Sequence, residues 1–189
     1  MADGHLGIWA AFGEMHPTGT EQRCWNHKIA NVLNDLPKTV QRQAAERLKA
    51  MPYAEPQGEC ERRRDAFVRT YHKTDKKAVE TLLRDGDRMV TFYAFPREHW
   101  RHLRTTTIVE SPFSSVRLRT DASRRYKRVA GATAIIWKML RVAEQAWRKL
   151  NASELLPLVA SGMTFKDGIA LKSGHERNHL DHQPERTAA

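Results

Sequence analysis

Residues 101–111 read RHLRTTTIVES, and the rest of the chain is organised around this stretch. Its single carboxylate, Glu110, follows a run of threonines and two β-branched apolar residues. Basic side chains stand on both sides of it, namely Arg101, His102, Arg104, Arg117 and Arg119. An isolated acid among cations is well placed to hold a metal ion beside a phosphate. The alternative is a glutamate at a helix start that interacts favourably with the helix dipole.

The composition limits the class of protein. A chain of 189 residues predicts one domain, or one domain with an appendage, and a hydrophobic fraction of 40% is enough for a core. The net charge of +10 favours a polyanionic partner, with nucleic acid first and an acidic membrane surface second. No apolar run approaches the length of a membrane span. The polar residues 1–5 do not resemble a signal peptide.

The two cysteines, Cys24 and Cys60, are too few for a disulfide framework and indicate a reducing compartment. Cys24 forms a Cys-x2-His pair with His27, but a structural zinc ion needs four ligands and no second pair stands at a suitable spacing. The pair is therefore a hydrogen-bonding unit beside a site, or simply a core cysteine and a surface histidine. A nucleophilic Cys24 would need a histidine base from another element, and His99 and His102 are the candidates.

Apolar residues recur at helical spacing through most of the chain, which predicts a mainly α fold. We expect seven or eight helices and at most one or two short strands, with residues 21–25 as a possible strand. The span from Thr39 to Phe95 should be almost wholly helical, and the longest helix should run from about Ala130 to Leu150. The polar tail from Lys172 should be disordered, and its histidines are too loosely spaced for a dedicated metal site.

Asp3 and Glu110 form the remaining pair of interest. Carboxylates gathered from distant positions can bind two Mg²⁺ ions about 3.5–4 Å apart, which clamp the attacking and leaving oxygens of a phosphodiester. Magnesium suits such a site because it accepts few protein carboxylates and keeps positions for water and phosphate. Two acids are too few for two ions, so this constellation is incomplete.

Several separated motifs together resemble the mutator-type bacterial insertion-sequence transposases. In chain order they are DGHLGIW at 3–9, QRCWNHK at 22–28, NVL at 31–33, LPK at 36–38, FPREHW at 95–100, LRTT at 103–106, IVES at 108–111 and the segment 113–120. The resemblance runs in order from Asp3 to about Gly168 and leaves out only the tail. Thr107, where the family commonly has Asn, and the segment 123–129 depart from the family pattern.

The resemblance implies an RNase H-like catalytic fold with an acidic triad of two aspartates and a glutamate. Asp3 matches the second aspartate, Glu110 matches the glutamate, and both would ligate Mg²⁺ or Mn²⁺. Cys24 and His27 match the family's Cys-x2-His motif near the site. No residue matches the first aspartate, so we expect the C-terminal half of a transposase, incomplete as a catalyst on its own.

The same resemblance divides the chain into four parts. Residues 1–36 would be a remnant of the RNase H-like core, 37–96 a helical insertion, 97–171 the catalytic glutamate region with C-terminal helices, and 172–189 a disordered tail. Because most of the parent sheet would be missing, we expect an exposed apolar face. Its residues would be Leu6, Ile8, Phe12 and Trp25.

The function implied is metal-dependent DNA cleavage and strand transfer in the bacterial cytoplasm, at the nucleoid. Partners would be transposon ends, target DNA, and further copies or intact transposase subunits. The alternatives are a non-catalytic DNA-binding or subunit-poisoning fragment, and an inert remnant. Between 101 and 128 only Glu110 and Asp121 are acidic. The candidate phosphate-binding cations there are Arg101, Arg104, Arg117, Arg119, Arg124, Arg125, Lys127 and Arg128.

Overall fold

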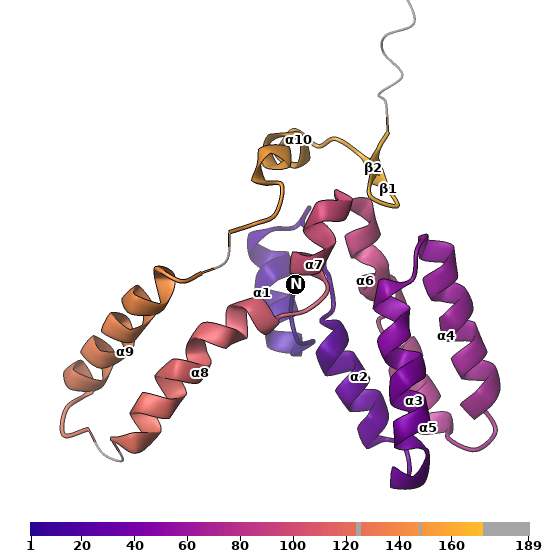
Figure 1. Cartoon of the computed structure of the whole chain (residues 1–189), viewed down its shortest axis with the longest axis horizontal. Coiled ribbons are helices and arrows are strands. Elements are labelled where there is room, and N and C mark those ends of the chain that lie inside the picture. The colour runs from indigo at the N-terminus through magenta and orange to yellow at the C-terminus, as the bar shows by residue number, and fades with distance from the viewer. Residues whose placement is uncertain (124–125, 148, 172–189) are drawn as a thin grey trace, which may run out of the picture.

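Helices dominate the computed structural model, which describes residues 1–123, 126–147 and 149–171 (Figure 1). The α-helices are α1 (Leu6–Met15), α2 (Trp25–Asn34), α3 (Lys38–Ala50), α4 (Gln57–Tyr71), α5 (Lys76–Leu83), α6 (Gly86–Val90), α7 (Trp100–Leu103), α8 (Thr107–Ala122), α9 (Val129–Glu144) and α10 (Leu156–Ala160). Short 3-10 helices are η1 (Met51–Tyr53), η2 (Thr91–Ala94), η3 (Arg97–His99) and η4 (Ser153–Leu155). The two strands are β1 (Phe165–Lys166) and β2 (Ile169–Ala170). The prediction of a mainly α chain is confirmed.

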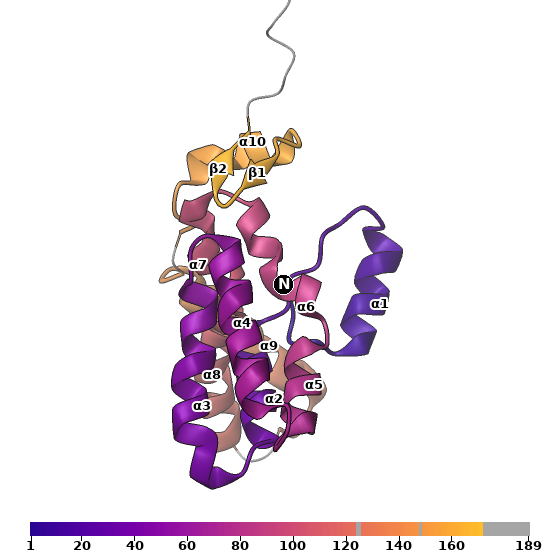
Figure 2. The same ribbon diagram turned by 90° about the vertical axis from the view of Figure 1, so that its right-hand side faces the viewer.

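The main core lies among α2, α3, α4 and α5, which pack side by side (Figures 1 and 2). Each helix turns one apolar stripe inward, as its spacing predicts. Val32 of α2, Leu48 of α3 and Ala78 of α5 are fully buried there. Asp35 and Leu36 follow α2, and Pro37 is the N-cap residue of α3. Every described element between Thr39 and Phe95 is helical, so the expectation for that span is confirmed.

An aromatic cluster from η2 and α7 forms part of the same core. The rings of Phe92, Tyr93 and Trp100 lie with centroids 4.1–5.4 Å apart, and the ring of Trp100 meets the other two edge-on. The guanidinium of Arg104 lies 5.2 Å from the Phe92 centroid and 5.5 Å from that of Trp100. Arg104 is thus held by packing directly before the start of α8.

The helices α8 and α9 lie side by side and diverge from the bundle as a hairpin (Figure 1). Among the side chains whose burial is described, Val116 is the only buried one in α8, and α9 has none. Phe113 and Leu118, two large apolar residues of α8, are 43% and 72% exposed. The hairpin therefore has little core of its own.

The helix expected to run to Leu150 ends instead at Glu144, and α8 is equally long at 16 residues. Beyond α9, residues 151 and 152 hydrogen-bond to histidines of η3 and α7, which a continued helix would not allow. The amide of Asn151 donates to His102 Nε2 at 3.1 Å, and the carbonyl of Ala152 lies 3.0 Å from His99 Nε2. Periodicity alone could not show these long-range contacts.

The helix α1 stands away from the bundle (Figure 2). The expected exposed apolar face is present in part, since Leu6 is 81% and Ile8 49% exposed, while Phe12 is half-buried. Trp25 was wrongly placed on that face, because it is only 3% exposed and its indole N–H donates to the Met89 carbonyl at 2.9 Å. The possible strand at 21–25 is a single parallel bridge between Ala2 and Arg23.

The strands β1 and β2 form a two-residue hairpin that the sequence analysis did not predict. Asp167 and Gly168 make its turn with φ of 49° and 82°, so the Asp-Gly dipeptide was the available signal. Asp167 Oδ1 accepts the backbone amide of Gln57 at 2.7 Å, which satisfies a free donor at the start of α4. Of the described helices, none is long and apolar enough to cross a membrane.

We expect Leu48→Ala to lower the free energy of unfolding by about 2–5 kcal/mol, because it opens a cavity in a fully buried site. Urea unfolding followed by circular dichroism measures this loss. Leu118→Ala in α8 is the matched control, and it should change stability by less than about 0.5 kcal/mol. Equal losses from the two variants would contradict the assignment of the core to the α2–α5 bundle.

Candidate functional site

The backbone of residues 22–24 is held from two sides. The amide of Ala2 donates to the Gln22 carbonyl at 3.0 Å, and the amide of Cys24 donates to the Ala2 carbonyl at 2.8 Å. Between these bonds, the amide of Arg23 donates to the Arg88 carbonyl at 2.8 Å. The segment carrying Asp3 is therefore fixed directly beside Cys24.

Asp3 lies in the segment directly before α1. Its side chain is exposed, and Oδ1 accepts the amide of His5 at 3.0 Å. His5 in turn caps α1, since its Nδ1 accepts the amide of Gly7 at 3.2 Å. The aspartate is thus held by its backbone and by one local hydrogen bond.

Thr106 contacts three of the predicted site residues, namely Cys24, His27 and Glu110. Its amide and hydroxyl lie 3.3 Å and 3.2 Å from Cys24 Sγ. The same hydroxyl lies 3.4 Å from His27 Nδ1 and hydrogen-bonds to Glu110 Oε1. His27 Nε2 lies 3.9 Å from Glu110 Oε1. Cys24, His27 and Glu110 are therefore one cluster, and Thr106, which the sequence analysis did not single out, lies at its centre.

The cluster sits where two helices begin. Cys24 is the N-cap residue of α2 and Thr106 that of α8, and Glu110 lies in the first turn of α8. The amide of Trp25 donates to the Arg104 carbonyl at 3.0 Å, which ties the two helix starts together. In the first turn of α8 the Glu110 carboxylate interacts favourably with the helix dipole. The same position also leaves it available for a functional role.

Burial acts to raise the pKa of the Cys24 thiol, but hydrogen bonds from Thr106 and His27 outweigh that effect and hold the pKa below its usual value. Cys24 is fully buried. The nucleophile hypothesis needed a base from His99 or His102, and both are bonded instead to residues 151–152. The geometry thus favours Cys24 as a hydrogen-bonding partner.

Lys28 follows His27 on α2, and its side chain is only 2% exposed. Its ammonium donates to the carbonyls of Thr81, at 2.9 Å, and Arg84, at the end of α5. It also lies 3.4 Å from the carboxylate of Asp85. Burial lowers the pKa of Lys28, and the charge of Asp85 opposes that shift. This lysine fixes α2 to α5 by satisfying free carbonyls.

The donor set fits a magnesium site only in part. Carboxylate oxygens are the ligands that Mg²⁺ takes, and Asp3 and Glu110 supply them. Ala2, the residue before Asp3, accepts a hydrogen bond from the Cys24 amide. Glu110 contacts Thr106, whose hydroxyl also lies beside Cys24 Sγ. In the part of the chain that the structure describes, no three His, Cys, Asp or Glu side chains gather to hold an ion.

Most of the predicted phosphate-binding cations are available at the surface. The exposed ones are Arg101, Arg117, Arg119, Lys127 and Arg128. Arg104 differs, because its guanidinium lies among aromatic rings, its Nε is buried without a hydrogen-bond partner, and burial lowers its pKa. A phosphate contact from Arg104 therefore conflicts with its packing. Arg124 and Arg125 lie outside the described residues, as does the tail from residue 172 onward.

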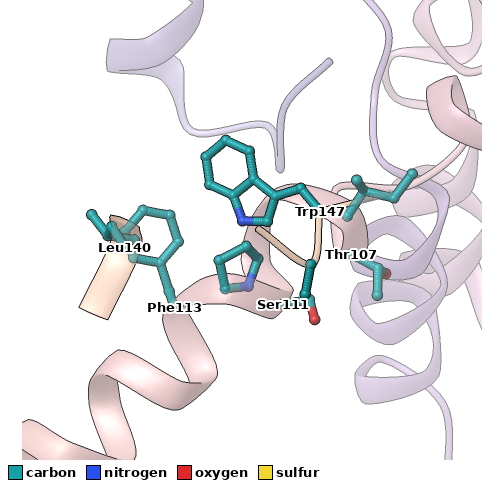
Figure 3. A pocket seen from close by; sticks show the side chains of 8 residues that line it. Thr107, Ser111, Phe113, Leu140 and Trp147 are labelled. Carbon is teal, nitrogen blue, oxygen red and sulfur yellow. The ribbon is translucent and has the colours of Figure 1, made fainter. Parts of the chain in front are cut away.

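An apolar groove of about 610 Å³ opens beside Glu110 and was not predicted (Figure 3). It lies between the start of α8 and the end of α9. Its lining residues are Thr107, Ile108, Ser111, Pro112, Phe113, Leu140, Ala146 and Trp147. The turn after Glu144 brings Trp147 into this groove.

Comparison with known proteins agrees with the motifs. A family profile described as "Transposase, Mutator family" matches residues 1–150. The transposase for insertion sequence element IST2 of Acidithiobacillus ferrooxidans is 40% identical over 169 residues, which are 89% of this chain and 57% of that protein. The transposase for insertion sequence element IS6120 of Mycolicibacterium smegmatis is 39% identical over 172 residues, 91% of this chain and 53% of that protein. The chain thus spans about half the length of these relatives.

We expect Gly4→Ala to disturb the Asp3 segment. Gly4 has φ of 94°, and an added Cβ would lie 1.8 Å from Nη1 of the buried Arg23. Positive φ costs a non-glycine residue roughly 1–2 kcal/mol, so thermal unfolding should show a loss of at least that size. Gly13→Ala in α1 is the control, since its Cβ meets nothing within 4 Å. It should raise stability by roughly 0.5–1 kcal/mol. A stabilising Gly4→Ala would overturn this description of the segment.

Proposed function

This chain belongs to the Mutator family of transposases, and we propose that it works on DNA in the transposition of insertion sequences. The observation that carries the proposal is the hydrogen-bonded cluster of Cys24, His27, Thr106 and Glu110. It unites the Cys-x2-His motif with the glutamate from a position more than eighty residues away. Such convergence supports a reactive carboxylate rather than a solitary surface acid.

In this proposal Asp3 and Glu110 are two carboxylates of the family's acidic triad, on a part of an RNase H-like core. Residues 1–36 and 97–171 then belong to the catalytic region, and 37–96 to the helical insertion. Mg²⁺ or Mn²⁺ would supply charge stabilisation at the phosphodiester. Since the described residues gather only part of a ligand set, we assign no catalytic step to this chain alone.

DNA would lie along the α8–α9 hairpin. Glu110 lies in the first turn of α8, Arg117 and Arg119 lie toward its end, and Lys127 and Arg128 directly precede α9. The end at which α8 leads into α9 points away from the bundle (Figure 1). Nine residues of α-helix separate Glu110 from Arg119, which corresponds to about 14 Å. At 3.4 Å per base pair, the tip would contact phosphates about four base pairs from the site of cleavage. These cations position the duplex without reading its sequence.

A second candidate function is a non-catalytic one, in which the chain binds DNA or joins subunits of an intact transposase and lowers their activity. The observation that favours it is the incomplete ligand set around Asp3 and Glu110. The two candidates share the DNA surface and differ in catalysis.

Binding to duplex DNA should be weak, independent of sequence and steeply dependent on salt, because released counterions supply its free energy. Fluorescence anisotropy with a labelled duplex, repeated between about 50 and 200 mM salt, measures the slope. Replacing Arg117 and Arg119 by alanine should reduce the magnitude of the slope by about 2.

The matched control replaces Arg69 and Lys73, which are exposed on and after α4. The charge change is the same, but the slope should remain close to that of the wild type. If both double variants change binding equally, DNA contacts are not concentrated on the hairpin. Affinity that does not fall with salt would contradict the electrostatic basis of the proposal.

We expect no strand transfer by this chain alone on a labelled insertion-sequence end in Mg²⁺ or Mn²⁺. Two carboxylates hold two ions poorly, so Glu110→Gln should leave any background cleavage unchanged. Denaturing gel electrophoresis of the labelled strand detects the products. Efficient turnover that Glu110→Gln abolishes would show a working enzyme and would exclude the non-catalytic candidate.

A further inference from the structure

We infer that Thr106 is a positioning residue for Glu110: its hydroxyl donates to Glu110 Oε1 while it accepts a hydrogen bond from Nδ1–H of His27. This deepens the proposed function and rests on it, since Glu110 is there the reactive carboxylate. The inference also fixes the tautomer of His27.

The hydroxyl of Thr106 has one proton for three neighbouring acceptors. A threonine hydroxyl has a single proton to donate and two lone pairs with which to accept. Three atoms surround Thr106 Oγ1: Cys24 Sγ at 3.2 Å, His27 Nδ1 at 3.4 Å and Glu110 Oε1, which is the nearest. An ionised carboxylate is the strongest acceptor of the three. The hydroxyl proton therefore goes to Glu110.

The other two contacts must then be made without that proton. The sulfur of Cys24 accepts the backbone amide of Thr106 at 3.3 Å, which needs no hydroxyl. Once its proton is directed to Glu110, Thr106 Oγ1 has only lone pairs to offer, so a hydrogen bond with His27 Nδ1 requires the hydrogen to be on Nδ1. The rival arrangement has Thr106 donating to a bare His27 Nδ1, with Nε2–H directed toward Glu110 at 3.9 Å. That distance is too long for a hydrogen bond. In the rival arrangement the close contact between Thr106 Oγ1 and Glu110 Oε1 would also have no proton between its two oxygens.

The consequence is a carboxylate of fixed orientation. Oε1 of Glu110 is engaged by the protein, which leaves Oε2 for chemistry. Two further bonds keep the helix starts in register: the Trp25 amide donates to the Arg104 carbonyl at 3.0 Å, and Asn26 Nδ2 donates to Thr107 Oγ1 at 3.0 Å. Thr106 thus relates Glu110 to Cys24, and through Cys24 to the Asp3 segment.

The test is ¹⁵N NMR of the imidazole rings in the full chain, at a pH of about 8.5, where ordinary histidines are neutral. The chain has 9 histidines, and comparison with His27→Gln identifies the ring. Protonated and bare ring nitrogens resonate far apart, so the tautomer is read directly. We expect the Nδ1–H form in the wild type and in Thr106→Ser, which keeps the hydroxyl. Thr106→Val should shift His27 toward the Nε2–H form that free histidine prefers.

The matched control is Thr105→Val, one residue earlier, which should leave the His27 signals unchanged. A wild-type His27 in the Nε2–H form would overturn the inference, as would a Thr106→Val variant that folds and keeps the Nδ1–H form. If circular dichroism shows that Thr106→Val is unfolded, the wild type and Thr106→Ser decide the matter by themselves. The measurement uses no DNA, so failure of DNA binding or cleavage is distinguishable from failure here.

Discussion

Cys24 is the residue at which the separate parts of the molecule meet. Its amide donates to the Ala2 carbonyl, its sulfur accepts from Thr106, and it begins α2. Buried backbone groups must find partners, and here they find them on segments about twenty residues before and eighty residues after. The Asp3 segment and the start of α8 are therefore both held at the N-terminus of α2, the first through the backbone of Cys24 and the second through its sulfur.

Two buried cations connect the site to the helical bundle. Lys28 satisfies carbonyls at the end of α5, and the guanidinium of Arg23 lies against Gly4 with Nε 3.9 Å from the Asp85 carboxylate. A buried charge is costly unless it is paired and hydrogen-bonded. The Lys28 ammonium meets both conditions, whereas Nε and Nη1 of Arg23 are buried with no hydrogen-bond partner among the described residues.

The α8–α9 hairpin combines a fixed base with a lightly packed remainder. Its base is held by Thr106 and by the Trp25–Arg104 backbone bond, whereas Val116 is its only buried side chain among those described. The exposed arginines follow from this geometry, because a helix with so little core turns most of its surface to solvent. The hairpin thus has a base held by hydrogen bonds and an exposed basic end, which is the surface that the proposed DNA contact uses.

The sequence by itself determined the helical class, the wholly helical span from 39 to 95, and the place of Glu110 in a first turn. Local spacing is enough for these, since helical periodicity and start signals depend on neighbours three or four residues away. It did not determine that Trp25 is buried, that Arg104 packs among aromatic rings, or that α9 stops at Glu144. Nor did it single out Thr106, although the residue stood inside a quoted motif. Each of these depends on a partner more than forty positions away or on a three-dimensional cluster, and only the folded chain brings such partners together.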